Sequence, residues 1–205
     1  MTKEIRAFNF EVRAEQDEEH GHFLTGQPIV YNERTDLGWY DEIIDEGALA
    51  ETDLRDVRFL VNHNTDMIPL ARSRNNNANS TMQMQVIPGV GMSIRVDLDT
   101  ENNAEAKSLY SAVSRGDISG MSFMFTVDSD IWEGLESDHP TRHIRNISKV
   151  FEVSAVTFPA YEATSITARG LSDALESAKA SLESAKAERR EIERKKQLIR
   201  ILSEV

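Results

Sequence analysis

Much of the chain between residues 5 and 168 consists of short segments in which apolar and polar side chains alternate. The alternation is clear at residues 8–12, 82–86 and 92–98. A period of two residues is typical of β-strands that bury one face. The sequence PGVG at 88–91 lies between two of these segments and has the composition of a hairpin turn. The pattern therefore predicts a domain built mainly of β-structure.

The rest of this region is predicted to contain further strands and two short helices. Further strands are expected at 27–32, 57–62, 118–128, 142–150 and 151–158. Two short helices are expected between strands, one near the sequence EGALAETDL at 46–54 and one at 102–115, which ends before Gly116. Many short strands with occasional helices favour a closed or nearly closed β-barrel surrounded by short helices.

The composition changes after Arg169 and Gly170. Residues 171–205 contain no glycine or proline, and side chains recur at spacings of three and four that predict a helix with a heptad-like seam. The seam positions are Leu175, Ala178, Leu182, Ala185, Arg189, Ile192, Lys196 and Ile199. Because two of them are basic, a marginal coiled coil or a helix that docks on a partner is favoured over a strong zipper. The chain thus divides into a β-barrel domain at 1–168 and a C-terminal helical extension at 169–205.

Composition and charge exclude several classes of protein. The 205-residue chain has a net charge of −12, which argues against a nucleic-acid partner because phosphate binding needs clustered Lys and Arg. It has no cysteine, which excludes a disulfide, a thiol nucleophile and a thiolate metal site. No apolar run approaches the roughly 20 residues that span a bilayer, and the charged N-terminus does not resemble a secretory signal. We therefore expect no membrane partner and a cytoplasmic location.

The five histidines differ in their surroundings. His20 and His22 lie in a polar segment without a defined third ligand, so no metal site is predicted there. His139 and His143 flank a proline in another polar segment, where a solvated role is expected. His63 instead follows the apolar run VRFLV, at the point where a buried strand emerges into a loop. That place suits an anchored catalytic imidazole, and it also suits a purely structural histidine at a strand end.

Ser122 is the candidate nucleophile. In a strand at 118–127, Met121 and Phe123 point to one side and Ser122 to the other, away from the aromatic core row. Gly120 removes a side chain from the same surface, which leaves space for another backbone to approach. An outward serine is common on exposed faces, so this feature alone does not establish catalysis. A serine hydroxyl becomes a nucleophile only when an adjacent base removes its proton.

Glu152 is the candidate third member of such a set. It is a carboxylate within the apolar strand sequence KVFEVSAVTF, and lone carboxylates are rare in such places without a partner. A carboxylate can orient an imidazole and stabilise its charged form. The strand phase leaves the geometry open, because His63 would point inward with Phe59 and Val61 unless the strand ends or bulges near Asn62.

Several segments together resemble the caudovirus (tailed-phage) prohead serine protease family. The matching segments are FLVNHN followed by PLAR, then RGDISGMSFMF, then FEVSAVTFPAYEATSI, and, near the N-terminus, IVYNERTDLGWYDEIIDEGAL. They cover roughly residues 5 to 168. One departure is Met124, which stands where a glycine is frequent in the family and bears on the local backbone shape.

The resemblance implies a fold similar to the herpesvirus maturation protease, assemblin, a β-barrel surrounded by helices with outward-facing serine and histidine. It implies that Ser122 is the nucleophile, His63 the general base and Glu152 the residue that orients His63, where the herpesvirus relatives use a second histidine. It also implies a serine endopeptidase without a cofactor.

The resemblance further implies the partners of the chain. The expected substrates are the major capsid protein, scaffold segments and the protease's own terminus, inside the assembling procapsid in the host bacterial cytoplasm. A homodimer is expected by the same analogy. Backbone N–H groups near the loop after Pro159, helped by Arg169, are one guess for the oxyanion hole. The alternative is a non-catalytic scaffolding or capsid-interaction protein built on the same barrel, in which the three residues would have no reason to occur together.

Overall fold

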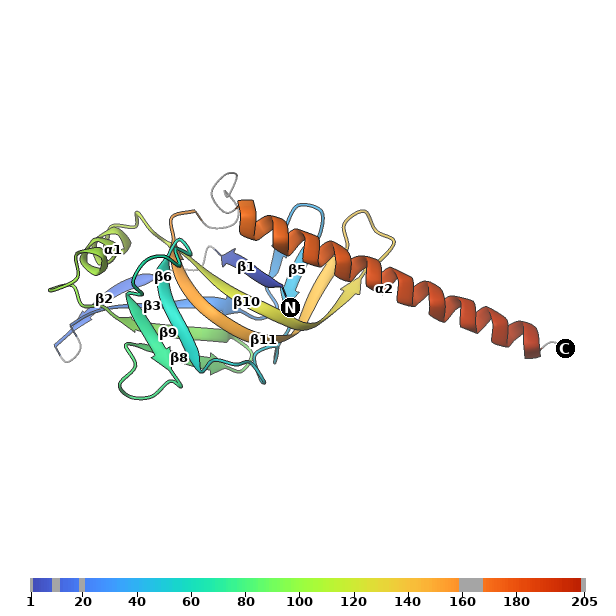
Figure 1. Ribbon diagram of the computed structural model, residues 1–205, viewed down its shortest axis with the longest axis horizontal. Coiled ribbons are helices and arrows are strands. Elements are labelled where there is room, and N and C mark those ends of the chain that lie inside the picture. The colour runs from blue at the N-terminus through green and yellow to red at the C-terminus, as the bar shows by residue number, and fades with distance from the viewer. Residues whose placement is uncertain (1, 9–11, 19–20, 159–167, 204–205) are drawn as a thin grey trace.

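The computed structural model describes residues 2–8, 12–18, 21–158 and 168–203 (Figure 1). Within these residues the fold is mainly β, with two helices. The strands are β1 (Lys3–Phe8), β2 (Arg13–Asp17), β3 (Gly21–Val30), β4 (Arg34–Asp36), β5 (Asp41–Ile44), β6 (Asp56–Val61), β7 (Ala71–Arg74), β8 (Met82–Ile87), β9 (Gly91–Asp97), β10 (Gly120–Glu133) and β11 (Thr141–Val156). The helices are α1 (Ala104–Ser114) and α2 (Ala168–Ser203).

The strands form two sheets. One has seven strands, in the order β1-β10-β11-β5-β4, with β6 added to β11 and β7 added to β6. The other has four strands, in the order β2-β3-β9-β8. The long strand β11 pairs in parallel with β5 along one half and with β6 along the other. The core lies where the buried faces of both sheets meet and includes Leu24, Met92, Phe123 and Val153.

The sequence predicted a closed or nearly closed barrel, and the described strands form no closed barrel, because the two sheets are not joined into one ladder. Between β7 and β8 the side-chain amide of Asn76 takes the place of a neighbouring strand. Asn76 accepts a hydrogen bond from the backbone N–H of Met84 and donates to the Met84 carbonyl, at 2.8 and 2.9 Å. At another corner a single backbone bond, from the Val12 N–H to the Ser119 carbonyl, links the two sheets. A side chain that satisfies backbone groups in this way ends strand pairing without leaving polar groups unpaired.

The strand predictions are otherwise largely confirmed. The predicted strands at 142–150 and 151–158 are one continuous strand, β11, and the PGVG sequence joins β8 to β9. Part of the predicted strand at 8–12 lies outside the described residues.

One of the two short predicted helices is confirmed. Helix α1 begins after Asn103, whose side chain accepts hydrogen bonds from two backbone N–H groups of the first turn. The expected helix at 46–54 is wrong, because this segment forms successive turns whose N–H groups bond three residues back. Gly47 has a φ of +87°, which a right-handed helix does not allow.

Helix α2 confirms the prediction that the C-terminal segment is helical. Its first half packs on the body, where Ala178 and Leu182 are buried against Tyr40 and Trp132. Its second half extends beyond the sheets (Figure 1) and carries exposed apolar side chains such as Leu198. Neither described helix is both long and apolar enough to cross a membrane.

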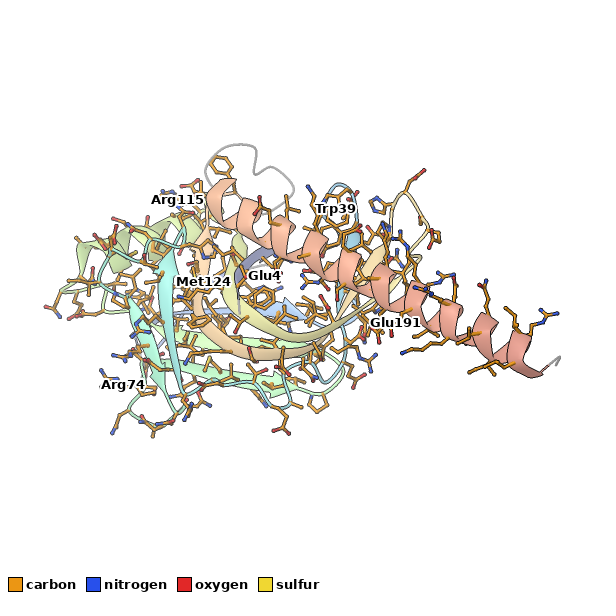
Figure 2. All side chains as sticks on the ribbon, turned by 45° about the vertical axis from the view of Figure 1, so that its right-hand side comes forward. Glu4, Trp39, Arg74, Arg115, Met124 and Glu191 are labelled. Atoms are coloured by element: carbon orange, nitrogen blue, oxygen red, sulfur yellow. The ribbon has the colours of Figure 1, made fainter. Side chains whose placement is uncertain are left out.

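Beneath the first half of α2 lies a cluster of buried charged side chains, which we call the ion cluster. Its members are Glu4 and Arg6 of β1, Glu42 of β5, Asp130 of β10 and Arg142 of β11. Figure 2 shows Glu4 of this cluster close to the first half of α2, and the Ser177 hydroxyl of α2 lies 3.4 Å from the Glu4 carboxylate. Burial raises the pKa of Glu4, but Arg6 and Arg142 outweigh burial and hold it below its ordinary value. Glu4 therefore stays ionised at neutral pH.

We predict that Arg142→Met destabilises the fold by about 3–5 kcal/mol, because it leaves three carboxylates of the cluster with a single cation, Arg6. Arg142 donates to both Glu4 and Asp130 from a fully buried position. Arg145→Met is the matched control, since Arg145 lies on the same strand but is half exposed and pairs with Asp45. It should cost less than about 1 kcal/mol. Urea unfolding followed by circular dichroism measures both. Equal losses in the two variants would contradict the role assigned to the cluster.

Candidate active site

The three residues singled out in the sequence lie in one hydrogen-bonded row. The Nε2 atom of His63 is 2.6 Å from the Ser122 hydroxyl oxygen. The Nδ1 atom of the same ring is 2.5 Å from a carboxylate oxygen of Glu152. Ser122 and Glu152 are buried, and the His63 side chain is 10% exposed. Ser122 lies on β10, Glu152 lies on β11, and His63 lies in the turn that follows β6.

His63 points toward this row because β6 ends before it. The strand stops at Val61, and both Asn62 and His63 have left-handed backbone conformations, with φ of 51° and 56°. The Asn62 side chain anchors the turn, because it accepts a hydrogen bond from the Thr157 N–H at 2.9 Å and donates to the Thr157 hydroxyl. Asparagine tolerates this conformation better than most residues. The inward direction expected from strand phase therefore does not apply to His63.

The register of β10 against β11 places the other two residues. Ser122 lies opposite Ser154, and Met124 lies opposite Glu152. Residues that face each other across two strands share one face of the sheet, so Ser122 and Glu152 lie on the same side, while Phe123 belongs to the core. The register shifts directly after Met124, where the sequence departs from the family's frequent glycine. The bulge lies beyond Ser122 and leaves its pairing unchanged.

Ser154 is a fourth member of the set that the sequence analysis missed. Its hydroxyl donates to the second carboxylate oxygen of Glu152 at 2.6 Å and accepts from the backbone N–H of His63 at 3.1 Å. It therefore ties the carboxylate to the turn that carries the imidazole. The sequence feature that could have identified Ser154 is its position two residues after Glu152 in an apolar strand, because this spacing puts both side chains on one face.

The backbone carbonyl of Arg6 also contacts the site. The Ser122 hydroxyl donates a hydrogen bond to the Arg6 carbonyl oxygen at 2.7 Å. Strand β1 carries this carbonyl and pairs with β10, with Ala7 opposite Ser122. Sequence reasoning had no signal for this contact, because a main-chain carbonyl is present at every residue.

The other predicted candidates lie outside the row. His20 falls outside the described residues, and the His22 ring is 2.7 Å from the Thr100 hydroxyl and packs on Tyr110. His139 is exposed and bonds to Asp41. The expected solvated role of His143 is wrong, because this residue lies within β11 and its Nδ1 atom is 2.8 Å from an Asp45 carboxylate oxygen.

The loop after Pro159, guessed to supply the oxyanion hole, lies outside the described residues, as does the side chain of Arg169. A groove of about 560 Å³ opens beside the His63 turn. It is lined by residues of that turn and of α1, among them Asn62, Met67 and Leu109.

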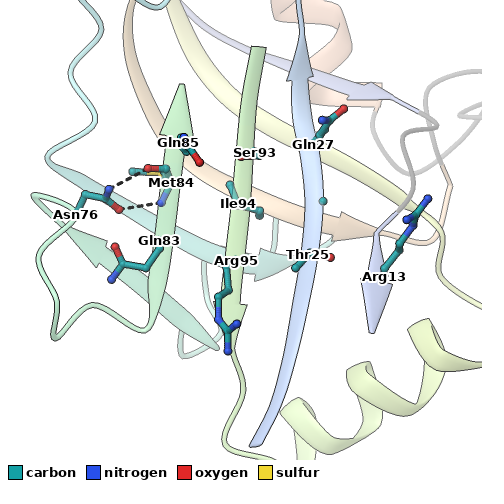
Figure 3. Close-up of a pocket in the computed structure, with 11 residues that line it drawn as sticks. Arg13, Thr25, Gln27, Asn76, Gln83, Met84, Gln85, Ser93, Ile94 and Arg95 are labelled. Atoms are coloured by element: carbon teal, nitrogen blue, oxygen red, sulfur yellow. Dashed lines mark hydrogen bonds between the residues drawn. The ribbon is translucent and has the colours of Figure 1, made fainter. Parts of the chain in front are cut away.

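A second groove of about 860 Å³ lies on the four-stranded sheet (Figure 3) and is lined by polar side chains such as Arg13, Gln83 and Arg95. None of the three predicted site residues lines it, so we do not assign it to the same site.

Comparison with known families identifies the chain. The family profile of the caudovirus prohead serine protease matches residues 8–177. The chain belongs to this family. It is therefore a peptide hydrolase of a family that acts in phage capsid maturation. Neither a search of curated proteins nor a search of solved structures gives a match.

We predict that Ser154→Ala lowers kcat for peptide cleavage about tenfold with KM unchanged. The variant loses one hydrogen bond to the Glu152 carboxylate, and a hydrogen bond to a charged group is worth about 1.5 kcal/mol. About 1.4 kcal/mol corresponds to a factor of ten in rate. Ser154→Thr keeps a hydroxyl and should recover part of the loss.

The matched control is Ser73→Ala, because Ser73 is equally buried and its hydroxyl has no hydrogen-bond partner among the residues that the structure describes. Steady-state kinetics with a fluorogenic peptide, measured from pH 5 to 9, tests this prediction. A rate and pH profile identical to those of the Ser73→Ala variant would exclude a positioning role for Ser154.

Proposed function

We propose that this chain is an endopeptidase of the phage prohead that cleaves peptide bonds by acyl transfer through Ser122, His63 and Glu152. The observation that carries the proposal is the row from the Ser122 hydroxyl through both ring nitrogens of His63 to the Glu152 carboxylate. Nucleophile, base and orienting carboxylate in hydrogen-bond reach of one another are the arrangement that this chemistry needs.

Each step of the reaction has a residue to perform it. The Ser122 oxygen attacks the carbonyl carbon of the scissile bond, and His63 Nε2 receives its proton. The carbon–nitrogen bond then breaks, and His63 returns the proton to the leaving amine. Water attacks the acyl ester with His63 again as base, which releases the carboxylate product and restores the Ser122 hydroxyl. The Glu152 carboxylate accepts the Nδ1–H bond throughout, which stabilises the charged imidazolium.

The proposed substrates are the major capsid protein, scaffold segments and the chain's own terminus, cleaved inside the assembling procapsid in the host cytoplasm. Membership of the prohead protease family supports this assignment. We propose that residues 1–168 form the protease unit and that 169–205 recruit it to its partner or complete a homodimer. The exposed apolar side chains on the projecting half of α2, such as Leu198 and Leu202, support that role for the helix.

We predict that Ser122→Ala abolishes cleavage of the coat partner and of the chain itself. The variant lacks the attacking oxygen, while the strand ladder on either side of residue 122 is unaffected by the change. Intact-protein mass spectrometry after incubation with the coat protein reports both activities, and circular dichroism checks the fold. Ser73→Ala serves as the control for a buried serine lost elsewhere. Cleavage by Ser122→Ala at the normal rate would eliminate the mechanism and favour a non-catalytic scaffolding protein.

We predict that Glu152→Gln lowers kcat by up to about 10⁴-fold, the loss that accompanies a neutral amide at the orienting position of a serine protease. The amide has the shape of the carboxylate but cannot stabilise an imidazolium. Single-turnover kinetics with a peptide ester and a peptide amide measures the effect. Full activity in Glu152→Gln would remove Glu152 from the mechanism and leave the roles of Ser122 and His63 standing.

A further inference from the structure

Strand β1 lies along the edge of β10 directly beside Ser122. It is the edge strand of its sheet and runs antiparallel to β10, from Lys3 opposite Thr126 to Phe8 opposite Met121. Extended peptides commonly bind proteins by adding a strand to the edge of a sheet. The chain's own N-terminal strand therefore occupies the edge at which a peptide could pair beside the nucleophile.

The contact between β1 and Ser122 competes with the proton transfer that catalysis requires. A serine hydroxyl has one hydrogen to donate, and two acceptors lie within reach of it, the Arg6 carbonyl oxygen at 2.7 Å and His63 Nε2 at 2.6 Å. While β1 is paired, the Arg6 carbonyl therefore competes with the base for this hydrogen. Ser122 is also fully buried. A substrate can reach Ser122 only after β1 leaves the edge.

The side chains of β1 are held by complementary charges. The Arg6 guanidinium makes two bonds to the Glu42 carboxylate, one of them at 2.6 Å, and lies 3.4 Å from the Tyr40 hydroxyl. Glu4, two residues earlier, accepts two bonds from Arg142 at 2.8 and 3.1 Å. Side chains two residues apart on a strand point to the same side. Both therefore enter one charged recess of the body.

The recess has a charge pattern of its own once β1 is set aside. Its remaining walls are Glu42, Asp130 and Arg142, and Arg142 contacts both carboxylates, Asp130 at 2.6 Å and Glu42 at 3.1 Å. Two carboxylates therefore share one cation, and Glu42 is the one that faces the place of the Arg6 side chain. A buried excess of negative charge is costly, so the recess favours a basic side chain at that place. Arginine suits it best, because its planar fork matches a carboxylate in a bidentate contact.

We propose that β1 is a built-in occupant of the substrate edge of β10, and that a substrate peptide replaces it in the same register with an arginine, recognised by Glu42, immediately before the scissile bond. In the free chain Arg6 occupies this position. Its carbonyl oxygen accepts a hydrogen bond from Ser122, and this contact holds β1 in place without cleaving it. The inference rests on the proposed function, because it takes Ser122 as the nucleophile.

The first test compares two fluorogenic peptides with the full-length chain. One carries the β1 sequence KEIRAF, and the other has glutamine in place of its arginine. We expect kcat/KM to be at least about tenfold higher for the arginine peptide, with the cut after arginine, because a site built to bond a charged group rejects an analogue that lacks it. Glu42→Gln should bring the ratio of the two rates close to one. Glu51→Gln, an exposed acidic residue outside the cluster, is the charge-matched control.

The second test asks whether β1 limits access to Ser122. Arg6→Gln weakens the hold on β1 and should raise the rate at which a fluorophosphonate labels Ser122 by about tenfold, whereas Lys3→Gln on the exposed end of the same strand should not. Equal labelling rates in the wild type and in Arg6→Gln would overturn the role of β1 as occupant. Because Arg6→Gln removes one of the two guanidiniums that contact Glu42, the folding of this variant is checked by circular dichroism. The peptide comparison does not depend on this variant.

The outcomes separate this inference from the proposed function. Cleavage that is lost in Ser122→Ala but shows no preference for arginine, in the wild type or relative to Glu42→Gln, overturns the inference and leaves the proposed mechanism intact. Cleavage that survives in Ser122→Ala overturns the proposed function, and the inference with it. The proposed function and the inference are both overturned as well if neither the peptides nor the coat protein are cut by the wild type or by Arg6→Gln.

Discussion

The pairing of β10 with β11 is the constraint on which the site depends. With Ser122 opposite Ser154 and Met124 opposite Glu152, hydroxyl and carboxylate share one face at a separation that a single imidazole can bridge. Strand β6 pairs with the other edge of β11, and the turn after it delivers that imidazole. If the register of β10 slipped by one residue, Ser122 and Phe123 would each move to the other face of the sheet. The buried aromatic side chains of β10 thus fix the geometry of the site as well as the stability of the sheet.

The ion cluster, in contrast, is not explained by a contribution to the stability of the fold. A largely buried group of five charges gains little over well-packed apolar side chains, because each charge loses its hydration. Its position is informative, since it joins β1, β5, β10 and β11 beneath α2, and the backbone carbonyl of its member Arg6 contacts Ser122. Buried charges are conformationally selective, because a strand that fits must supply the matching charge at each place. Recognition of a peptide strand accounts for the cluster better than stabilisation does.

The sequence predicts the parts of this protein that follow from local patterns. Alternation placed most strands, and the parity of Met121, Ser122 and Phe123 gave the direction of the serine. The parts that it could not predict arise from backbone and long-range geometry. The amide of Asn76 stands in for a strand, Asn62 and His63 adopt left-handed conformations, and the Arg6 carbonyl meets Ser122 across more than a hundred residues. None of these depends on a periodicity, so none leaves a pattern to detect.

Under the proposed function, the arrangement explains how a protease can be assembled and restrained at once. All three side chains of the row are already in contact, so activation requires no rearrangement among them. The Arg6 carbonyl competes with His63 for the proton of Ser122 while β1 is paired, and this competition ends when β1 is displaced. A substrate strand in the same register would replace the ladder bonds that β1 gives up, so the exchange costs less than opening the edge alone. The same charged recess then provides both substrate specificity and inhibition, because the charges that hold β1 are also those that select the peptide that replaces it.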